Sequence, residues 1–304
     1  MWQSQAQPTP PVSVVVMTHN RCEELCRTLT RMTSLPERVP IIVMDNGSTD
    51  DTVETTRHQF PDVSVVRCGA NLGAVARNLG VALARTPYVA FCDDDTWWQP
   101  GSLSCAANLL DAHPRLASIT ARILVEPDLR EDPITPELRH SPVPAPPDLP
   151  GPALMSVLAG ATMFRVSAFQ QVGGFSRKLW LGGEEELLSL DLASRGWWMC
   201  WAENVVVHHA PSRQRDSRRR RQLGIRNTIW TSWLRRPVPV AVRRTAAVLR
   251  QAPRDRATLA AVLEAAAGAP WVLRERRVVP PGVEAALQTL EATQLRSPAR
   301  RYVG

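Results

Sequence analysis

Hydrophobic runs and helical patterns alternate along the first hundred residues of the chain. Short runs rich in β-branched residues occur at Val12–Met17, Ile41–Met44, Val63–Arg67 and Tyr88–Cys92. Between these runs, apolar residues recur with helical spacing at about residues 22–33, 51–59 and 74–84. Because parallel strands need a crossover helix between them, this alternation predicts an α/β fold with a mostly parallel, doubly wound sheet.

Polar residues follow each of the four predicted strands. They lie at Thr18–Arg21, Asp45–Asp50, Gly69–Gly73 and Asp93–Asp95. In a doubly wound sheet, ligands bind beyond the carboxyl ends of the strands. The sequence therefore predicts a polar binding site at that edge of the sheet.

Three consecutive aspartates, Asp93, Asp94 and Asp95, follow the fourth strand. Adjacent carboxylates repel one another unless a positive charge lies among them. With strand-like alternation, Asp93 and Asp95 share a face, whereas Asp94 points elsewhere. Mg²⁺ and Mn²⁺ take one or two carboxylates and complete their shell with water and substrate phosphates, so we predict a divalent metal site here. The structural alternative is an acidic turn that caps the next helix.

Two further residues are candidates for ligand binding. Asp45 follows the second strand, where an acidic residue is well placed to accept hydrogen bonds from a ribose or a base edge. Arg77 lies one helical turn beyond Gly73, where its guanidinium would neutralise a phosphate or pair with one of the aspartates. The structural alternatives are a glycine-containing turn at Asp45 and a surface ion pair at Arg77.

The second half of the chain is less regular. Nine of the 27 residues between Glu126 and Pro152 are proline, which predicts a long surface loop without regular structure. An acidic helix is expected at Glu184–Arg195, closed by Gly196, and a short strand at Val205–Val207. Arg-rich helical segments follow from residue 211 onward.

Composition and length favour a folded protein with one large domain and an appendage. The chain has 304 residues, of which 44% are hydrophobic and 21% charged. No apolar run reaches the roughly 18 residues that a membrane span needs, and the first twelve residues lack the features of a secretory signal. The six cysteines show no CxxC pair, which favours reduced thiols. We therefore expect a cytoplasmic location.

The net charge of +7 is unevenly distributed along the chain. Residues 213–304 contain 20 arginines and 6 acidic residues, so the C-terminal part is strongly basic and the remainder is acidic. This division predicts a flexible N-terminus at 1–12, a main domain at 13–210 and a basic helical region at 211–304.

The basic region has two interpretations. Segments such as Arg213–Arg221 and Ala241–Arg250 would hold the protein at an anionic membrane surface, as a peripheral protein of the inner face. Alternatively, the guanidinium groups pack on the acidic body. Nucleic acid is not an expected partner, because no nucleic-acid-binding motif is present.

Six segments, in this order, resemble family 2 glycosyltransferases of the nucleotide-diphospho-sugar transferase (GT-A) fold. They are Ser13–Asn20, Val43–Thr52, Asn71–Asn78, Val89–Pro100, Gly160–Phe175 and Gly183–Trp197. The resemblance covers about residues 13–209. It implies an inverting transfer of a sugar from a nucleotide-diphospho-sugar donor, with Mn²⁺ or Mg²⁺, to a glycan, lipid-linked or small-molecule acceptor.

The resemblance also implies roles for individual residues. Thr18, Asn20 and Asp45 would contact the nucleotide, and Asp94 and Arg77 would complete the nucleotide-sugar site. Asp93 and Asp95 would hold the metal-bound diphosphate, together with His208, which matches a family histidine; His209 is the competing candidate.

The general base of the family is a carboxylate in a Glu-Asp pair at the start of a later helix. This chain has Glu184, Glu185 and Glu186 at that place, and alignment from Gly196-Trp197 puts Glu185 on the family aspartate. The alternative is that these carboxylates only stabilise the helix N-terminus, by about 0.3–1 kcal/mol each.

Two tryptophans, Trp98 and Trp180, are candidates for stacking on a sugar ring. A non-catalytic sugar-nucleotide-binding protein is the alternative function. A dinucleotide-dependent oxidoreductase is disfavoured, because the turn at Met17–Arg21 contains no glycine.

Overall fold

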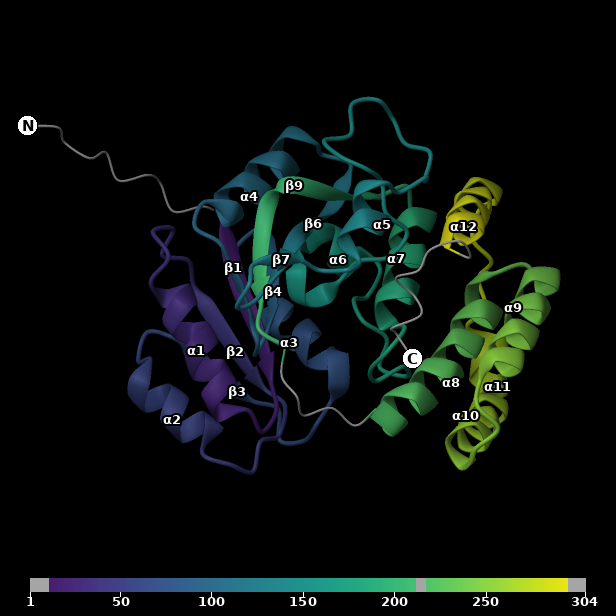
Figure 1. The fold of residues 1–304 in the computed structure, drawn as a ribbon, viewed down its shortest axis with the longest axis horizontal. Coiled ribbons are helices and arrows are strands. Elements are labelled where there is room, and N and C mark those ends of the chain that lie inside the picture. The colour runs from purple at the N-terminus through teal and green to yellow at the C-terminus, as the bar shows by residue number, and fades with distance from the viewer. Residues whose placement is uncertain (1–10, 212–216, 295–304) are drawn as a thin grey trace, which may run out of the picture.

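A β-sheet with both parallel and antiparallel strands lies at the centre of the main domain, and a set of helices lies beside it (Figure 1). The structure, a computed structural model, describes residues 11–211 and 217–294. The strands within these ranges are β1 Val12–Thr18, β2 Ile41–Asp45, β3 Ser64–Arg67, β4 Tyr88–Asp93, β5 Thr96–Trp98, β6 Leu116–Val125, β7 Arg130–Glu131, β8 Thr162–Arg165 and β9 Trp198–His209.

The order of strands along the sheet is β3-β2-β1-β4-β8-β6-β9-β5, and β7 pairs with β6. The first four strands in this order are parallel, β8 is antiparallel to both of its neighbours, and β6 runs parallel to β9. The register pairs Thr18 with Asp45 and Met17 with Asp93, so the carboxyl ends of β1, β2 and β4 meet at one edge. This arrangement confirms the predicted α/β class and the parallel pairing of the four strands predicted in the first half of the chain.

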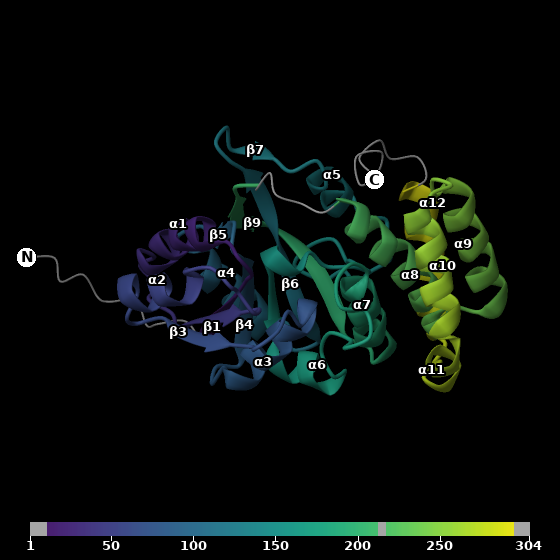
Figure 2. The ribbon, with the colours of Figure 1, turned by 90° about the horizontal axis from the view of Figure 1, so that it is seen from below.

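Helices cover both faces of the sheet (Figure 2). Val14 and Val16 of β1 face one hydrophobic cluster with α1 and α4, whereas Val15 faces a second cluster with α3, α6 and α7. This alternation is why the runs of the parallel strands are apolar throughout. The helices of the main domain are α1 Cys22–Thr33, α2 Thr52–Gln59, α3 Ala76–Leu83, α4 Ser102–Ala112, α5 Thr135–Arg139, α6 Val166–Gln171 and α7 Glu184–Ser194.

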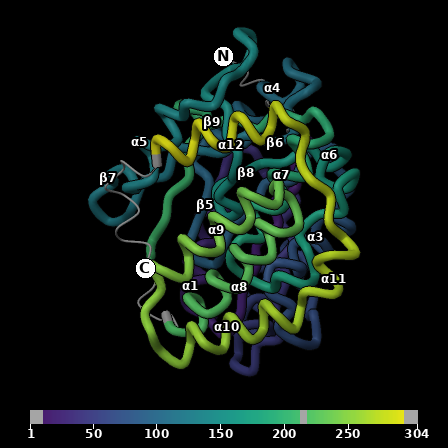
Figure 3. Tube along the Cα trace, turned by 90° about the vertical axis from the view of Figure 1, so that its right-hand side faces the viewer, coloured from purple at the N-terminus to yellow at the C-terminus, as the bar shows by residue number. Residues whose placement is uncertain are grey.

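Five further helices follow the sheet domain and lie together on one side of it (Figure 3). Part of their contact with the main domain is made by α7, because Leu187 of α7 shares a hydrophobic cluster with Ile225 and Ile229 of α8. They are α8 Ser217–Arg235, α9 Val238–Gln251, α10 Arg256–Ala267, α11 Ala269–Arg274 and α12 Pro281–Gln294.

Many arginines of these helices meet carboxylates of the same protein. Arg244 lies 2.8 Å from Glu186 of α7, and Arg236 is wholly buried with its Nε 2.6 Å from Glu284. The pair of Arg244 and Glu186 agrees with the second interpretation of the basic region, in which guanidinium groups pack on the acidic body, whereas Arg236 and Glu284 both belong to the basic region. Residues 213–216 of the segment Arg213–Arg221 lie outside the described residues.

The structure corrects several expectations about secondary structure. The proline-rich segment 126–152 contains regular structure, namely β7 and α5. Helix α5 tolerates Pro136 because this residue lies in its first turn, where a missing N–H breaks no helical hydrogen bond. The strand expected at Val205–Val207 is much longer and pairs with β6 along most of its length. The helices α4 and α11 and the strand β6 were not predicted.

The first strand begins within the segment that was expected to be flexible. Val12, the last residue of the segment expected to be flexible, is buried at the start of β1, and residues 1–10 lie outside the described part. Among the described residues, no helix combines the length and the apolar character that crossing a bilayer requires.

Candidate active site

A pocket of about 540 Å³ lies at the carboxyl edge of the parallel strands. Residues that follow β1, β2, β3 and β4 form its walls, together with the segment before α7, the end of β9 and the first turns of α8. The charged residues that line it are Arg21, Arg77, Asp93, Asp94, Asp95, Arg219 and Arg220, and two histidines, His19 and His209, join them. The structure therefore has a pocket at the edge where the sequence predicts a polar site, and both cationic and anionic side chains line it.

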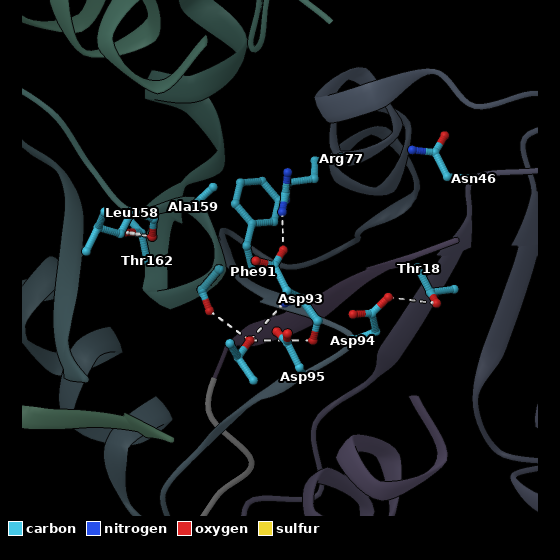
Figure 4. Close-up of polar contacts among 12 residues, drawn as sticks. Thr18, Asn46, Arg77, Phe91, Asp93, Asp94, Asp95, Leu158, Ala159 and Thr162 are labelled. Atoms are coloured by element: carbon cyan, nitrogen blue, oxygen red, sulfur yellow. Dashed lines mark hydrogen bonds and ion pairs between the residues drawn. The ribbon is translucent and has the colours of Figure 1, made fainter. Parts of the chain in front are cut away.

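Each of the three aspartates has a different set of partners (Figure 4). Asp93 forms an ion pair with Arg77, and Asp94 accepts a hydrogen bond of 3.1 Å from the hydroxyl of Thr18. Arg21 lies 3.1 Å from Asp94 and 3.3 Å from Asp95. Two cationic side chains therefore offset the repulsion among the three carboxylates.

The surroundings of Asp94 change its acidity. Burial, together with the negative charges of Asp95 and Asp93, raises the pKa of Asp94 to about 7, although Arg21 and Thr18 act in the opposite direction. A carboxylate with such a pKa gains stability from any additional positive charge. The pocket is therefore electrostatically suited to a cation.

The donor atoms present fit a hard divalent cation that also takes ligands from its substrate. Asp93 and Asp95 offer carboxylate oxygens at the end of one strand, which suits Mg²⁺ or Mn²⁺ bound with substrate phosphates. Within residues 11–211 and 217–294, no three His, Cys, Asp or Glu side chains form a ready-made metal cage. A bound diphosphate would have to supply the remaining ligands.

The two histidines of β9 point in different directions. The Nε2 atom of His209 lies 3.8 Å from Asp95, and His209 lines the pocket. His208, the residue implied by the family resemblance, instead lies 2.8 Å from Glu126 and stacks on Trp97. Because successive residues of a strand face opposite sides, only one of the pair reaches the aspartates, and the structure brings His209 there.

Three residues expected at the nucleotide occupy different positions. Thr18 lines the pocket, but Asn20 and Asp45 do not. Asn20 has a left-handed backbone with φ of 53°, and its Oδ1 accepts a hydrogen bond of 2.8 Å from the N–H of Thr49. The buried carboxylate of Asp45 accepts from the N–H of Ser48 at 3.1 Å. Both side chains fix the loops around the pocket.

Arg77 is held rigidly beneath the pocket. Its guanidinium is buried on α3 and lies about 6 Å from the rings of Phe91 and Phe175. Gly160 packs against Asp93 so closely that a Cβ at this position would lie 2.6 Å from a carboxylate oxygen of Asp93. The ion pair of Arg77 and Asp93 is thus confined by packing on both sides.

The three glutamates at the start of α7 have distinct environments. The carboxylate of Glu185 accepts a hydrogen bond from the N–H of Ala159, and that of Glu186 pairs with Arg244 at 2.8 Å. Glu184 is buried, and its Oε2 has no hydrogen-bond partner among the described residues. Burial and the charge of Glu184 raise the pKa of Glu185 to about 8.

Glu185 does not line the pocket, yet it lies within electrostatic reach of it. Its carboxylate accepts from the N–H of Ala159, and the next residue, Gly160, packs directly against Asp93 of the ion pair at the end of β4. A carboxylate whose pKa lies near neutrality is suited to accept a proton at physiological pH.

The segment 179–183, which leads into α7, is clamped from two sides. The side-chain amide of Asn227 on α8 donates to the carbonyls of Leu179 at 2.9 Å and Leu181 at 3.1 Å, and also to that of Gly182. On the other side, the N–H of Ala74 donates to the carbonyl of Trp180 at 2.7 Å. The clamp holds Trp180 in the pocket wall and fixes the start of α7.

The two tryptophans proposed for sugar contact differ sharply. Trp180 lines the pocket. Trp98 is wholly buried, and its indole N–H donates to the carbonyl of Phe91 at 3.2 Å, so its assignment as a sugar contact is wrong.

Several pocket residues were not singled out from the sequence. Arg21 belongs to the polar tetrapeptide after β1 and Asn46 follows Asp45, so a signal was present for both. Arg219 and Arg220 were hidden in a basic run, because nothing in their spacing shows that α8 begins beside the aspartates.

One family model matches more than half of the chain. The model of the family described as "Glycosyl transferase family 2" matches residues 13–173. An N-acetylglucosaminyl-diphospho-decaprenol L-rhamnosyltransferase from Mycobacterium tuberculosis is 26% identical, and the match covers 68% of this chain and 79% of that protein.

Two solved structures share the fold. A mannosyltransferase from Pyrobaculum calidifontis, solved with GDP-Man and Mn²⁺, has a TM-score of 0.55 and 18% identity, and the match covers 95% of this chain and 88% of that one. The structure of GalNAc-T7 with UDP, GalNAc and Mn²⁺ has a TM-score of 0.61 and 14% identity, and the match covers 90% and 57% respectively.

Proposed function

The chain belongs to glycosyl transferase family 2, and we propose that it transfers its sugar with inversion of configuration in a reaction that depends on Mn²⁺ or Mg²⁺. As a glycosyltransferase, it moves a sugar from a nucleotide-activated donor to an acceptor. One observation carries the finer proposal: the pocket gathers three aspartates and several arginines, and Glu185, with its raised pKa, lies beside it.

The diphosphate of the donor would lie among the cationic side chains of the pocket. Arg21 and Arg77 approach from the main domain, and Arg220 approaches from α8. Thr18 and Asn46 line the part of the pocket next to β1 and β2, where the nucleotide would bind. Asn20 and Asp45 support this part by fixing the loops that follow these strands.

Asp93 and Asp95 would hold the divalent cation, and His209 is the histidine placed to assist them. When bound there with the diphosphate, the cation supplies positive charge against the negative charge that develops on the leaving nucleotide diphosphate. Arg77 keeps Asp93 at the end of β4, so that this carboxylate is in position before the donor arrives.

Glu185 is the proposed general base. It would accept the proton of the acceptor hydroxyl while the hydroxyl oxygen bonds to the anomeric carbon and the bond from that carbon to the diphosphate oxygen breaks. Attack from the face opposite the leaving group inverts the anomeric configuration. An α-linked donor would therefore give a β-linked product.

For the acceptor we propose a sugar linked through a diphosphate to an isoprenoid lipid. The mycobacterial relative, by its name, acts on such a compound. Most of this chain aligns with that relative, and exposed arginines on the C-terminal helices suit a peripheral position on the inner face of a membrane. The enzyme would then be cytoplasmic and would meet its acceptor at the lipid surface.

A thermal-shift screen of UDP-, GDP- and dTDP-sugars with and without Mn²⁺ tests donor binding, because a ligand of the folded state raises its melting temperature. We expect one nucleotide class to raise the melting temperature, and to do so more strongly with Mn²⁺. Nuclear magnetic resonance of the product then shows the anomeric configuration. Retention of configuration, or equal shifts with and without metal, would contradict the proposal.

A further inference from the structure

A second cavity lies among the C-terminal helices, away from the active-site pocket. It has a volume of about 370 Å³ and lies between α8, α9, α10 and α11. This volume is within the range of about 300–1,000 Å³ that is usual for ligand pockets. Ile229, Trp230 and Trp233 of α8 form one wall, and Val262 and Val272 lie on neighbouring helices.

The walls of this cavity offer a ligand almost no hydrogen bonds. The indole N–H of Trp230 donates to the carbonyl of Ala265 at 3.0 Å, and that of Trp233 donates to the hydroxyl of Thr245 at 3.1 Å. Thr245 is the one polar side chain among the described residues that line the cavity, and this hydrogen bond engages it. The cavity therefore favours an occupant without polar groups.

The mouth of the cavity resembles a lipid-facing surface. Leu249 is 41% exposed and Leu273 is 64% exposed, and both line the cavity. Each is followed by an exposed arginine, Arg250 and Arg274 respectively. Exposed leucines beside arginines are typical of surfaces that lie against anionic lipid, so an apolar chain would enter from that side.

Helix α8 connects this cavity to the active site. Arg220 lines the active-site pocket, and Trp230 lines the apolar cavity ten residues later on the same helix. At 1.5 Å per residue, the two positions are about 15 Å apart along the helix axis. Leu223, also in the active-site pocket, lies two helical turns before Trp230 and on the same face of α8.

We propose that this cavity binds the isoprenoid tail of the acceptor lipid. The distance between the cavity and the active-site pocket suits a molecule that occupies both. Its sugar and diphosphate would lie at the active site, and its apolar chain would extend from there to the cavity. The identity of the acceptor rests on the proposed function. The affinity of the cavity for an isoprenoid chain follows from its own walls and can be measured without any transfer reaction.

The test is a calorimetric titration of the full-length protein with farnesyl diphosphate, farnesol and inorganic pyrophosphate. Ala266 lines the cavity and is exposed, whereas Ala267 is exposed and does not line it. Ala266→Phe therefore narrows the cavity, and Ala267→Phe is the matched control on the same helix. Ala269→Phe, at a second exposed lining position, repeats the test on α11.

We expect farnesyl diphosphate and farnesol to bind the unmodified protein and the Ala267→Phe variant equally well. In both lining variants their affinity falls about tenfold or more, because each buried methylene contributes a factor of about four. Excess pyrophosphate leaves the binding of farnesol unchanged, since the diphosphate-binding groups lie in the other pocket.

Three results would overturn the proposal. The first is equal affinity for farnesol in the lining variants and the control. The second is displacement of farnesol by phosphatidylglycerol vesicles as effectively as by farnesyl diphosphate, which would assign the cavity to an acyl chain. The third is a dimer that Ala266→Phe dissociates, which would assign the cavity to a second copy. Melting shifts with donor sugars, measured on the same samples, report separately on the proposed function.

Discussion

Replacement of Glu185 by glutamine tests the assignment of the base through two independent measurements. The pKa of this carboxyl is raised to about 8 by burial and by the charge of Glu184. A base works only when it is deprotonated, so kcat/KM is expected to rise about tenfold per pH unit up to about pH 8 and then to level off. Glu185→Gln should lower the rate at pH 8 by at least about 10²-fold and leave a residual rate that varies little with pH.

The free energy of unfolding of Glu185→Gln should change in the opposite direction to its rate: at high pH the variant loses activity but gains stability. Because the folded-state pKa of Glu185 is raised, its contribution to stability is fully present below the unfolded value of about 4.5 and is lost as pH rises through about 8. Above pH 8 the protein must keep an ionised carboxylate in a mostly buried site. The change in pKa corresponds to a few kcal/mol. Glu185→Gln is thus expected to have a higher free energy of unfolding than the unmodified protein at pH 9, and little gain at pH 4.

Glu186→Gln is the matched control, because Glu186 lies on the same turn and pairs with Arg244. It removes one partly exposed ion pair, worth about 0–1 kcal/mol, and should leave the pH profile of the rate unchanged. The assays are initial rates of donor turnover with saturating Mn²⁺, and urea unfolding at each pH. A full rate in Glu185→Gln, or a profile that flattens in Glu186→Gln instead, would show that the base lies elsewhere.

Three further predictions concern the walls of the pocket. Asp95→Ala should reduce donor turnover by at least about 10²-fold and abolish the extra melting shift that Mn²⁺ gives with the donor, whereas Asp51→Ala, on the exposed turn before α2, should change neither. Gly160→Ala should slow turnover with little change in fold, measured by kinetics and circular dichroism, because its Cβ would lie 2.6 Å from Asp93. Asn227→Ala should cost about 1–3 kcal/mol in urea unfolding, because the carbonyls of Leu181 and Gly182 lose the side-chain amide that donates to them, and it should also weaken binding of the sugar donor. Unchanged stability would contradict the clamp.

The sheet could be predicted because its signals are local. Each of the four parallel strands is a short apolar run followed by polar residues, and the helices between them keep their apolar residues on one face. The helix at residues 22–33 even begins and ends as predicted. The segment 126–152 could not be predicted from its prolines, because their effect depends on whether each lies inside a helix or in its first turn.

Part of the candidate site could also be predicted, because its residues directly follow strands that the sequence predicts. The carboxyl ends of β1, β2 and β4 meet wherever the strands are parallel, so Thr18 and the aspartates were expected together. The direction of a side chain at a strand end is set by register, and the sequence did not show whether His208 or His209 would face Asp95. Arg220 could not be found at all, because its place in the pocket depends on how α8 packs against α7.

The adjacent glutamates Glu185 and Glu186 in this sequence acquire different chemistry from partners that lie far away along the chain. Glu185 meets the backbone of Ala159, and its pKa is raised to about 8 by burial and by the charge of Glu184, whereas Glu186 forms an ion pair with Arg244. The C-terminal helices supply both the partner of Glu186 and, through Asn227, the clamp on the segment before α7. The basic region therefore acts on the active site as part of its framework, and changes on α8 that touch no substrate should still alter catalysis.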